Sequence, residues 1–183
     1  MLAAFTVAVA QARGVIGAKR EAELVGHLTE IPSRAGEVSH HDERIQEIAP
    51  GSPRRATCPI SAARRLPAEG YAAGAMKHGP IALIDETVPV VVLAPNDDLL
   101  EKTLGNVEEV MARGGRVVMI SDAAGVARLE GRLASGIAVP RCDPFVAPLL
   151  YAIPIQLLAY HAAVSKGSDV DQPRNLAKSV TVE

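Results

Sequence analysis

Tryptophan is absent from this chain of 183 residues, and aromatic residues make up only 3% of it. Hydrophobic residues nevertheless reach 48%, so the core must be built mainly from Ala, Val, Leu and Ile. Small aliphatic side chains are typical of a buried parallel sheet packed by alanine-rich helices. The length is sufficient for one ordinary domain with a sizeable core.

The chain also lacks an excess of charge, since 19 basic residues face 21 acidic ones and the net charge is −2. No basic surface therefore predicts a nucleic-acid partner. The two cysteines, Cys58 and Cys142, match no zinc or redox spacing and are expected to be unpaired thiols in a reducing compartment. We expect a cytoplasmic protein.

The first twelve residues are apolar, but no basic residue precedes them and they are too short to span a bilayer. We expect a buried helix here and no membrane partner. Further helices are predicted over 21–28, after Gly14 and Gly17, and from Pro32 to about residue 49, with the proline in the first turn. Residues 1–49 therefore read as a helical segment.

Residues 50–67 have a different composition, with four prolines and four arginines and no acidic residue. Neither a helical nor a strand period fits them. An exposed loop is the simplest interpretation of this segment.

From residue 88 the pattern becomes regular. Continuous apolar runs at 88–94 and 116–120 predict buried parallel strands, and 136–140 a weaker third one. A helix carrying Leu100, Leu104, Val107 and Met111 ends at Gly114, and a long apolar helix covers 145–164, where Pro148 and Pro154 should kink or split it. We therefore expect residues 85–165 to belong to a doubly wound α/β unit with a parallel sheet.

Ligands in such folds bind at the carboxyl ends of the strands. Asn96, Ser121 and Asp122 should lie at that edge. Two interpretations remain open for them: a ligand site, or ordinary turn and helix-cap residues.

The polar tail at 169–183 carries one lysine between small residues, in Asn-Leu-Ala-Lys-Ser-Val-Thr-Val-Glu. The string resembles the C-terminal tail of the glutamine:fructose-6-phosphate amidotransferase family. The resemblance implies that Lys178 forms an imine with a keto sugar, without metal or organic cofactor. Burial, or a cation such as Arg174, would lower the lysine pKa and increase the reactive free amine.

Residues 69–85, with Lys-His-Gly-Pro at 77–80, resemble the histidine-bearing segment of the same family. There the histidine opens the sugar ring, often at a neighbouring subunit's site, and this role falls to His78. An imidazole suits it because it titrates near neutral pH. No pattern supports His27, His40, His41 or His161, which are expected to be solvent-exposed or packing residues.

The resemblance implies four segments: inter-lobe helices at 1–49, a disrupted stretch at 50–67, a partial second sugar-isomerase (SIS) lobe at 68–165 and a catalytic-type tail at 166–183. The implied fold is an incomplete SIS-type doubly wound parallel sheet preceded by a helical segment.

Three family features are not found in the sequence: the glutaminase, with its cysteine after the initiator, the Ser/Thr-rich phosphate loop, and the helix with the acid–base glutamate. We interpret residues 50–67 as a deletion or frame-shift scar at that helix. Glu69 is the nearest acidic residue, but it lies beyond the base helix of the family. Loss of a strand and a helix should leave a sheet edge and apolar surface uncovered.

These features together predict a fragment of an isomerizing glutamine–fructose-6-phosphate transaminase, inactive in isolation. The expected partners are a sugar phosphate, fructose 6-phosphate, and either further copies of the chain or full-length subunits. Three alternatives stay open: another SIS-type sugar-phosphate isomerase, a non-catalytic module that binds a sugar phosphate or dimerises, and a gene remnant.

Overall fold

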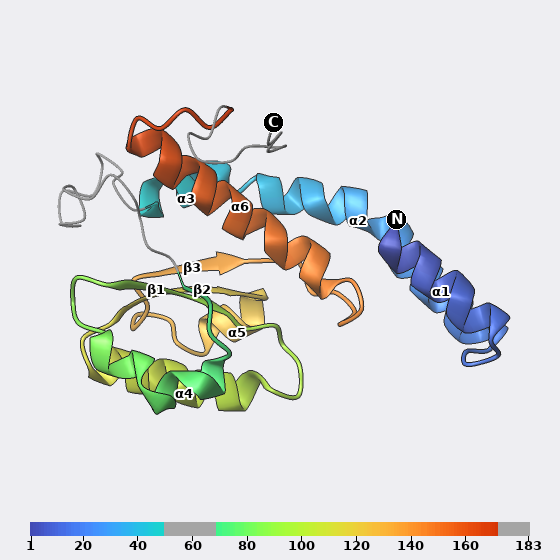
Figure 1. Cartoon of the computed structure of the whole chain (residues 1–183), viewed down its shortest axis with the longest axis horizontal. Helices are drawn as coiled ribbons and strands as arrows, with labels where there is room; N and C mark the ends of the chain where they lie inside the picture. The colour runs from blue at the N-terminus through green and yellow to red at the C-terminus, as the bar shows by residue number, and fades with distance from the viewer. Residues whose placement is uncertain (50–68, 172–183) are drawn as a thin grey trace, which may run out of the picture.

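The computed structural model describes residues 1–49 and 69–171. They form a parallel sheet with helices on both faces, and a helical pair extends to one side (Figure 1). Along the chain the elements are α1 Leu2–Ala12, α2 Ala18–Ser39, α3 Asp42–Ile48, the 3₁₀ turns η1 Ala73–His78 and η2 Pro80–Leu83, β1 Pro89–Leu93, α4 Leu100–Ala112, β2 Arg116–Ser121, α5 Ala123–Ala127, β3 Ser135–Ala138 and α6 Ala147–Ser165.

The sheet follows the sequence prediction closely. Its three strands are parallel in the order β1-β2-β3, with Val90 beside Val117 and Ile120 beside Ile137. Strand β3 ends at Ala138, two residues before the predicted end at Pro140, which cannot donate a backbone hydrogen bond. The predicted α/β class and parallel arrangement are confirmed.

Strand β2 supplies side chains to both cores. Val117 and Met119 join α4 on one face, while Val118 and Ile120 join α2, α3 and α6 on the other. Since successive side chains of a strand point to opposite faces, an uninterrupted apolar run is what a strand covered on both sides requires.

Helix α4 ends at the predicted glycines, and the reason is visible in its last turn. Gly114 adopts φ +83°, a left-handed conformation typical of the residue that terminates a helix. A Cβ on Gly115 would come within 2.7 Å of side-chain atoms of Ile84 and Val110. The two glycines therefore end the helix and let the chain turn closely into β2.

Helix α6 runs without a break, so of the two outcomes predicted for its prolines, a kink or a split, the split is wrong. Pro148 lies in the first turn, where its missing N–H has no helical partner to lose. Pro154 is inside the helix and buried against the core. By length and composition α6 is also apolar enough to cross a membrane. Its buried residues, however, pack on the sheet and on α2 and α3, as in the core helix of an α/β fold.

Helices α1 and α2 depart from the prediction in two ways. Pro32 does not begin a helix but lies inside α2, which is continuous from Ala18. The apolar residues Leu24, Ile31, Ala35 and Val38 recur at helical spacing across this proline, and packing of Ile31, Ala35 and Val38 in the core with α6 favours one helix. Helix α1 is formed as predicted, but its expected burial is wrong, because Val7 is its only buried residue.

Within residues 1–49 and 69–171 no strand or helix covers the edge of the sheet at β1. Among the described residues β1 pairs only with β2. Val91 and Leu93 are 41% and 42% exposed, although their partners Val118 and Ile120 are buried under the helices. The helical layer thus covers β2 and β3 but not β1, and the burial predicted for the strand at 88–94 is wrong.

Asp122, the residue after β2, connects helix α5 to the loop that follows β1. Its Oδ1 accepts a hydrogen bond of 2.7 Å from the Gly125 N–H and caps α5, while its Oδ2 accepts one of 2.9 Å from Asn96 Nδ2 in the loop after β1. Ser121 Oγ donates to the Ala94 carbonyl at 2.5 Å. A Cβ added at position 125 would overlap Ser121 Oγ, so only glycine fits here.

Replacing Leu150 with Ala tests the core under α6. Leu150 is 0% exposed, so Leu150→Ala should lower the free energy of unfolding by about 2–5 kcal/mol through lost burial and a cavity. The neighbouring Leu149 is 45% exposed, and Leu149→Ala should cost less than about 1 kcal/mol. Urea unfolding followed by circular dichroism measures both; equal losses would contradict this packing.

Replacing Asp122 tests the cap. Asp122→Ala should destabilise the fold by about 1–2 kcal/mol, because the Gly125 N–H loses its acceptor. Asp122→Asn keeps an acceptor oxygen and should cost clearly less. Thermal unfolding of the two variants measures the loss of stability. An Asp122→Ala variant as stable as the wild type would show that the cap is not formed.

Candidate functional site

The carboxyl edge of the sheet is polar, but its polar groups are engaged within the fold. Ser121 is 0% and Asp122 5% exposed, and their side chains make the loop and cap hydrogen bonds described above. Of the two interpretations left open by the sequence, turn and cap chemistry is the one the geometry supports. This edge fixes the loops after β1 and β2 in place.

Two ionisable groups lie beside this edge, Tyr151 of α6 and Cys142 of the loop after β3. Burial raises the pKa of Tyr151 well above its ordinary value, and the hydrogen bond with Ser121 only partly opposes it. Burial also raises the pKa of the Cys142 thiol, against a smaller opposite effect of Arg34. Both groups are protonated at neutral pH, so Cys142 is not an activated nucleophile.

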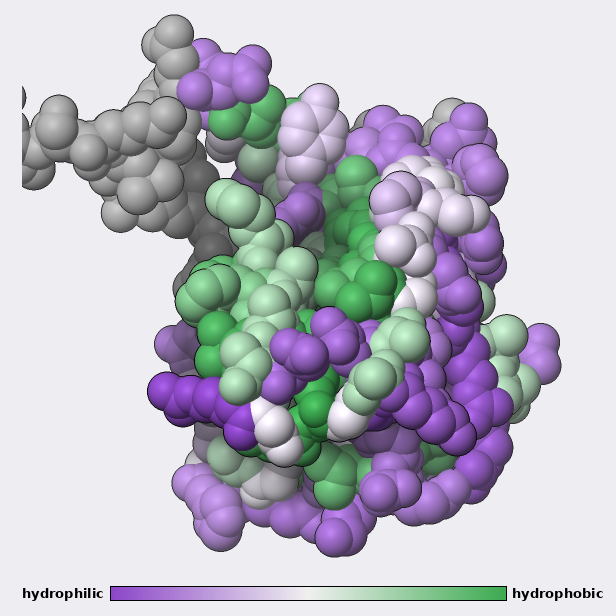
Figure 2. All heavy atoms as spheres, turned by 90° about the vertical axis from the view of Figure 1, so that its right-hand side faces the viewer, coloured by the Kyte–Doolittle hydropathy of each residue, from purple (hydrophilic) through white to green (hydrophobic). Residues whose placement is uncertain are grey.

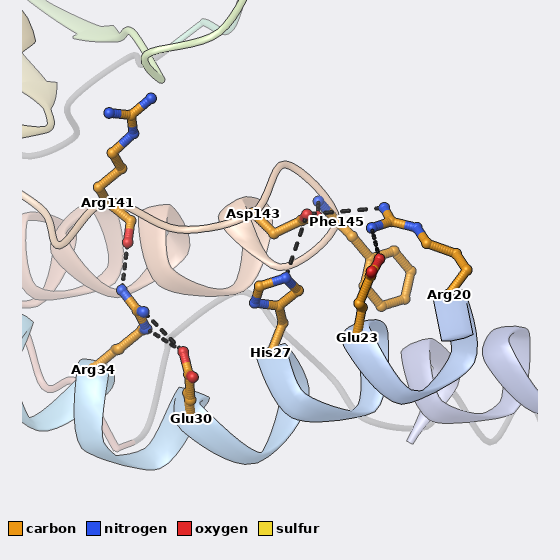
Figure 3. Close-up of polar contacts among 8 residues, drawn as sticks. All are labelled: Arg20, Glu23, His27, Glu30, Arg34, Arg141, Asp143 and Phe145. Carbon is orange, nitrogen blue, oxygen red and sulfur yellow. Dashed lines mark hydrogen bonds and ion pairs between the residues drawn. The ribbon is translucent and has the colours of Figure 1, made fainter. Parts of the chain in front are cut away.

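Helix α2 holds the loop that follows β3 (Figure 3). Asp143 accepts a hydrogen bond of 2.9 Å from the Phe145 N–H, and its other oxygen lies 3.6 Å from His27 Nε2 and 3.8 Å from Arg20. Farther along α2, Arg34 donates to the backbone carbonyl of Arg141. The loop at the carboxyl end of β3 is thus tied to α2 at two points.

This α2 cluster is the feature that sequence reasoning missed. Arg20, His27 and Arg34 recur every seven residues and so share one face of a helix. That spacing was a usable signal, whereas their partners Asp143 and Arg141 lie more than a hundred residues away. In Figure 3 the Arg141 guanidinium points away from α2, so its backbone is held while its side chain extends outward.

His161 is a packing residue, as expected. It is 8% exposed, and its Nε2 lies 2.7 Å from Asp42 Oδ1, which joins α6 to the start of α3.

The two residues predicted to carry chemistry are not brought together in the described part of the chain. His78 ends η1 with an exposed side chain, and Lys178 lies outside the described residues. The neighbouring Lys77 forms a 2.7 Å ion pair with Glu109 of α4. Turn η1 therefore lies against α4 and presents His78 at the surface.

An open hollow of about 850 Å³ lies between α3 and the edge strand β3. Its charged lining is Glu43, Glu47 and Glu130 against a single Arg44. The excess of carboxylates disfavours a phosphate there. Within residues 1–49 and 69–171 no group of three His, Cys, Asp or Glu side chains is arranged to hold a metal ion.

Comparison with known proteins identifies relatives along the entire chain. The glutamine–fructose-6-phosphate aminotransferase [isomerizing] of Gluconobacter oxydans is 48% identical over 200 aligned positions, covering 100% of this chain and 33% of the relative. The protein of that name from Zymomonas mobilis is 44% identical with the same coverage. This chain therefore spans about a third of the length of these curated relatives.

A solved structure shows the same fold. The C-terminal domain of glucosamine-fructose-6-phosphate aminotransferase from Francisella tularensis superposes with a TM-score of 0.81 and 33% identity, over 92% of this chain and 52% of that one. The SIS domain family matches residues 62–166, more than half of the chain. The resemblance predicted from the tail and the Lys-His-Gly-Pro segment is confirmed, and this chain belongs to the SIS domain family.

Proposed function

We propose that this chain is a fragment of an isomerizing glutamine–fructose-6-phosphate aminotransferase, the enzyme that makes glucosamine 6-phosphate for hexosamine biosynthesis in the cytoplasm. The observation that carries the proposal is the 44–48% identity to enzymes of that name along the whole chain, together with the shared fold. The ligand is a sugar phosphate, fructose 6-phosphate. The chain acts as a homo-oligomer or pairs with full-length subunits.

An internal deletion accounts for the uncovered sheet edge. The 200 aligned positions exceed the 183 residues of this chain by 17, so the relative carries residues that this chain lacks. A deletion of this size is large enough for a strand or a short helix. The exposed Val91 and Leu93 on β1 are the surface that such an element would cover. We place the deletion at 50–67, a segment that lies mostly before the SIS match at 62–166.

The isolated chain should not convert fructose 6-phosphate to glucosamine 6-phosphate. The carbon-to-carbon proton transfer needs an acid–base group, and the family's glutamate helix is not found in the sequence. Two steps can survive: opening of the sugar ring by His78, and attack of the Lys178 amine on the C2 ketone. In the second step a C–N bond forms, water leaves and an imine results.

Imine formation can be tested by borohydride trapping. Incubation of the folded chain with fructose 6-phosphate and borohydride should give one stable secondary amine on Lys178, located by intact mass and peptide mapping. Lys178→Ala should abolish the adduct, while Lys166→Ala, which alters the lysine at the start of the tail segment, should keep it. No adduct on a folded chain, or an adduct that survives Lys178→Ala, would contradict the proposal.

The role of His78 can be separated from that of Lys178 with two ketones. Fructose 6-phosphate is mostly a closed ring, whereas dihydroxyacetone phosphate is acyclic and needs no opening. His78→Gln should slow trapping of fructose 6-phosphate about tenfold or more, as loss of a general acid–base does, and leave trapping of the acyclic ketone unchanged. The exposed His40 offers the control His40→Gln. Equal slowing with both ketones would assign His78 a structural role.

A further inference from the structure

Strand β1 has a row of backbone groups that faces away from the sheet. The Ala94 N–H, just after the strand, donates to the Ile120 carbonyl of β2 at 2.9 Å. In a parallel ladder alternate residues turn both the N–H and the C=O to the same neighbour, so the even-numbered residues of β1 bond to β2. Val91 and Leu93 therefore turn their N–H and C=O outward, where no strand in the part of the chain that the structure describes pairs with them.

The side chains beside this row are apolar and open to solvent. Val88, Val91 and Leu93 are 38%, 41% and 42% exposed, although the cross-strand neighbours of the last two, Val118 and Ile120, are only 6% and 0% exposed. Figure 2 views the molecule from the end to which β3 points in Figure 1, and hydrophobic side chains open at the surface there between hydrophilic ones. One more strand with apolar side chains would extend the core past β1.

Strand β1 has little of the protection that sheet edges usually carry. Natural edge strands are guarded by charged side chains, bulges or prolines. The sequence PVVVL contains no charged residue, and its register with β2 runs without a bulge from Pro89 to Leu93. Pro89 removes a donor only at the first position of the strand. The edge is therefore open to pairing at Val91 and Leu93.

The chemistry of this edge fits one kind of occupant. Outward N–H and C=O groups on alternate residues are matched by the backbone of another extended chain, as in peptide recognition by strand addition. The exposed Val91 and Leu93 favour apolar side chains on that chain, and β1 offers a charged side chain no partner of opposite sign. Because β1 has five residues, the pairing segment is about as short.

We propose that the free edge of β1 is a strand-acceptor site, which binds a short, extended, apolar and uncharged segment of another protein through the backbone groups of Val91 and Leu93. This site goes beyond the proposed function, since it involves neither His78 nor Lys178 nor the sugar phosphate.

Peptide binding to the whole chain tests the site. The probe is a fluorescein-labelled peptide with the sequence of β2, Arg116–Ser121, which already pairs with β1 on its other side; two lysines added at its end, outside the pairing segment, keep it soluble. Fluorescence anisotropy without sugar phosphate should show saturable binding of one peptide per chain. The same peptide with Met119→Pro loses a central N–H and should bind at least tenfold more weakly.

Two variants of the protein locate the contact. Leu93→Lys places a charge on the edge and should weaken peptide binding at least tenfold. Val25, 45% exposed on α2, supplies a control of similar exposure, and Val25→Lys should bind the peptide like the wild type. Circular dichroism checks that each variant is folded.

Amide hydrogen exchange, resolved by nuclear magnetic resonance, identifies the backbone pairing. In the free protein the N–H groups of Val91 and Leu93 should exchange faster than those of Val90 and Val92, which bond to β2. The bound peptide should slow exchange at Val91 and Leu93.

Three results would overturn the proposal. The first is a folded chain that does not bind the peptide, or binds the proline peptide equally well. The second is binding that Leu93→Lys leaves unchanged. The third is protection of the Val91 and Leu93 amides in the free protein, which would show that the edge is already occupied, by a second copy if dilution removes the protection. Because no sugar is present, failure of borohydride trapping leaves these outcomes unaffected.

Discussion

Burial of strand β2 on both faces is the constraint on which the rest of the structure depends. Val117 and Met119 pack with α4, and Val118 and Ile120 pack with α6 and the α2–α3 pair. Both helical layers are therefore positioned by one strand. The same strand ends at Ser121, and Asp122 follows it as the cap of α5. The hydrogen bonds of these two side chains fix the loop after β1 and the start of α5.

The parts governed by local periodicity could be predicted from the sequence, and those governed by distant packing could not. The apolar runs identified β1 and β2, and Gly114 identified the end of α4. Burial on both faces explains the run in β2, and the left-handed glycine explains the helix end, but the run in β1 is left partly exposed. Pro32 and Pro154 led to wrong predictions of helix boundaries. Each proline removes a backbone hydrogen bond, but the core packing of the residues around it stabilises one continuous helix. Composition could not show that, in the described part of the chain, Val7 is the only buried residue of α1.

The candidate site divides in the same way. His78 and Lys178 came from resemblance to a family, and their roles stay predictions. The contacts of Asp143 with His27 and Arg20 join segments more than a hundred residues apart. No local sequence pattern predicts which distant residue pairs with this face of α2. The structure adds the contacts that position the loops. Helix α2 holds the loop after β3 through Arg34, and α4 holds η1 through the Lys77–Glu109 ion pair, which leaves His78 exposed.

Equilibrium binding tests most directly our proposal that this chain is a sugar-phosphate module with an interrupted second lobe. Isothermal titration of the folded protein with fructose 6-phosphate, with fructose and inorganic phosphate as separate controls, measures it without requiring chemistry. We expect saturable binding of fructose 6-phosphate at one site per chain, and much weaker binding of fructose or inorganic phosphate alone. Absence of heat with fructose 6-phosphate on a chain shown to be folded, or equal affinity for inorganic phosphate, would contradict it.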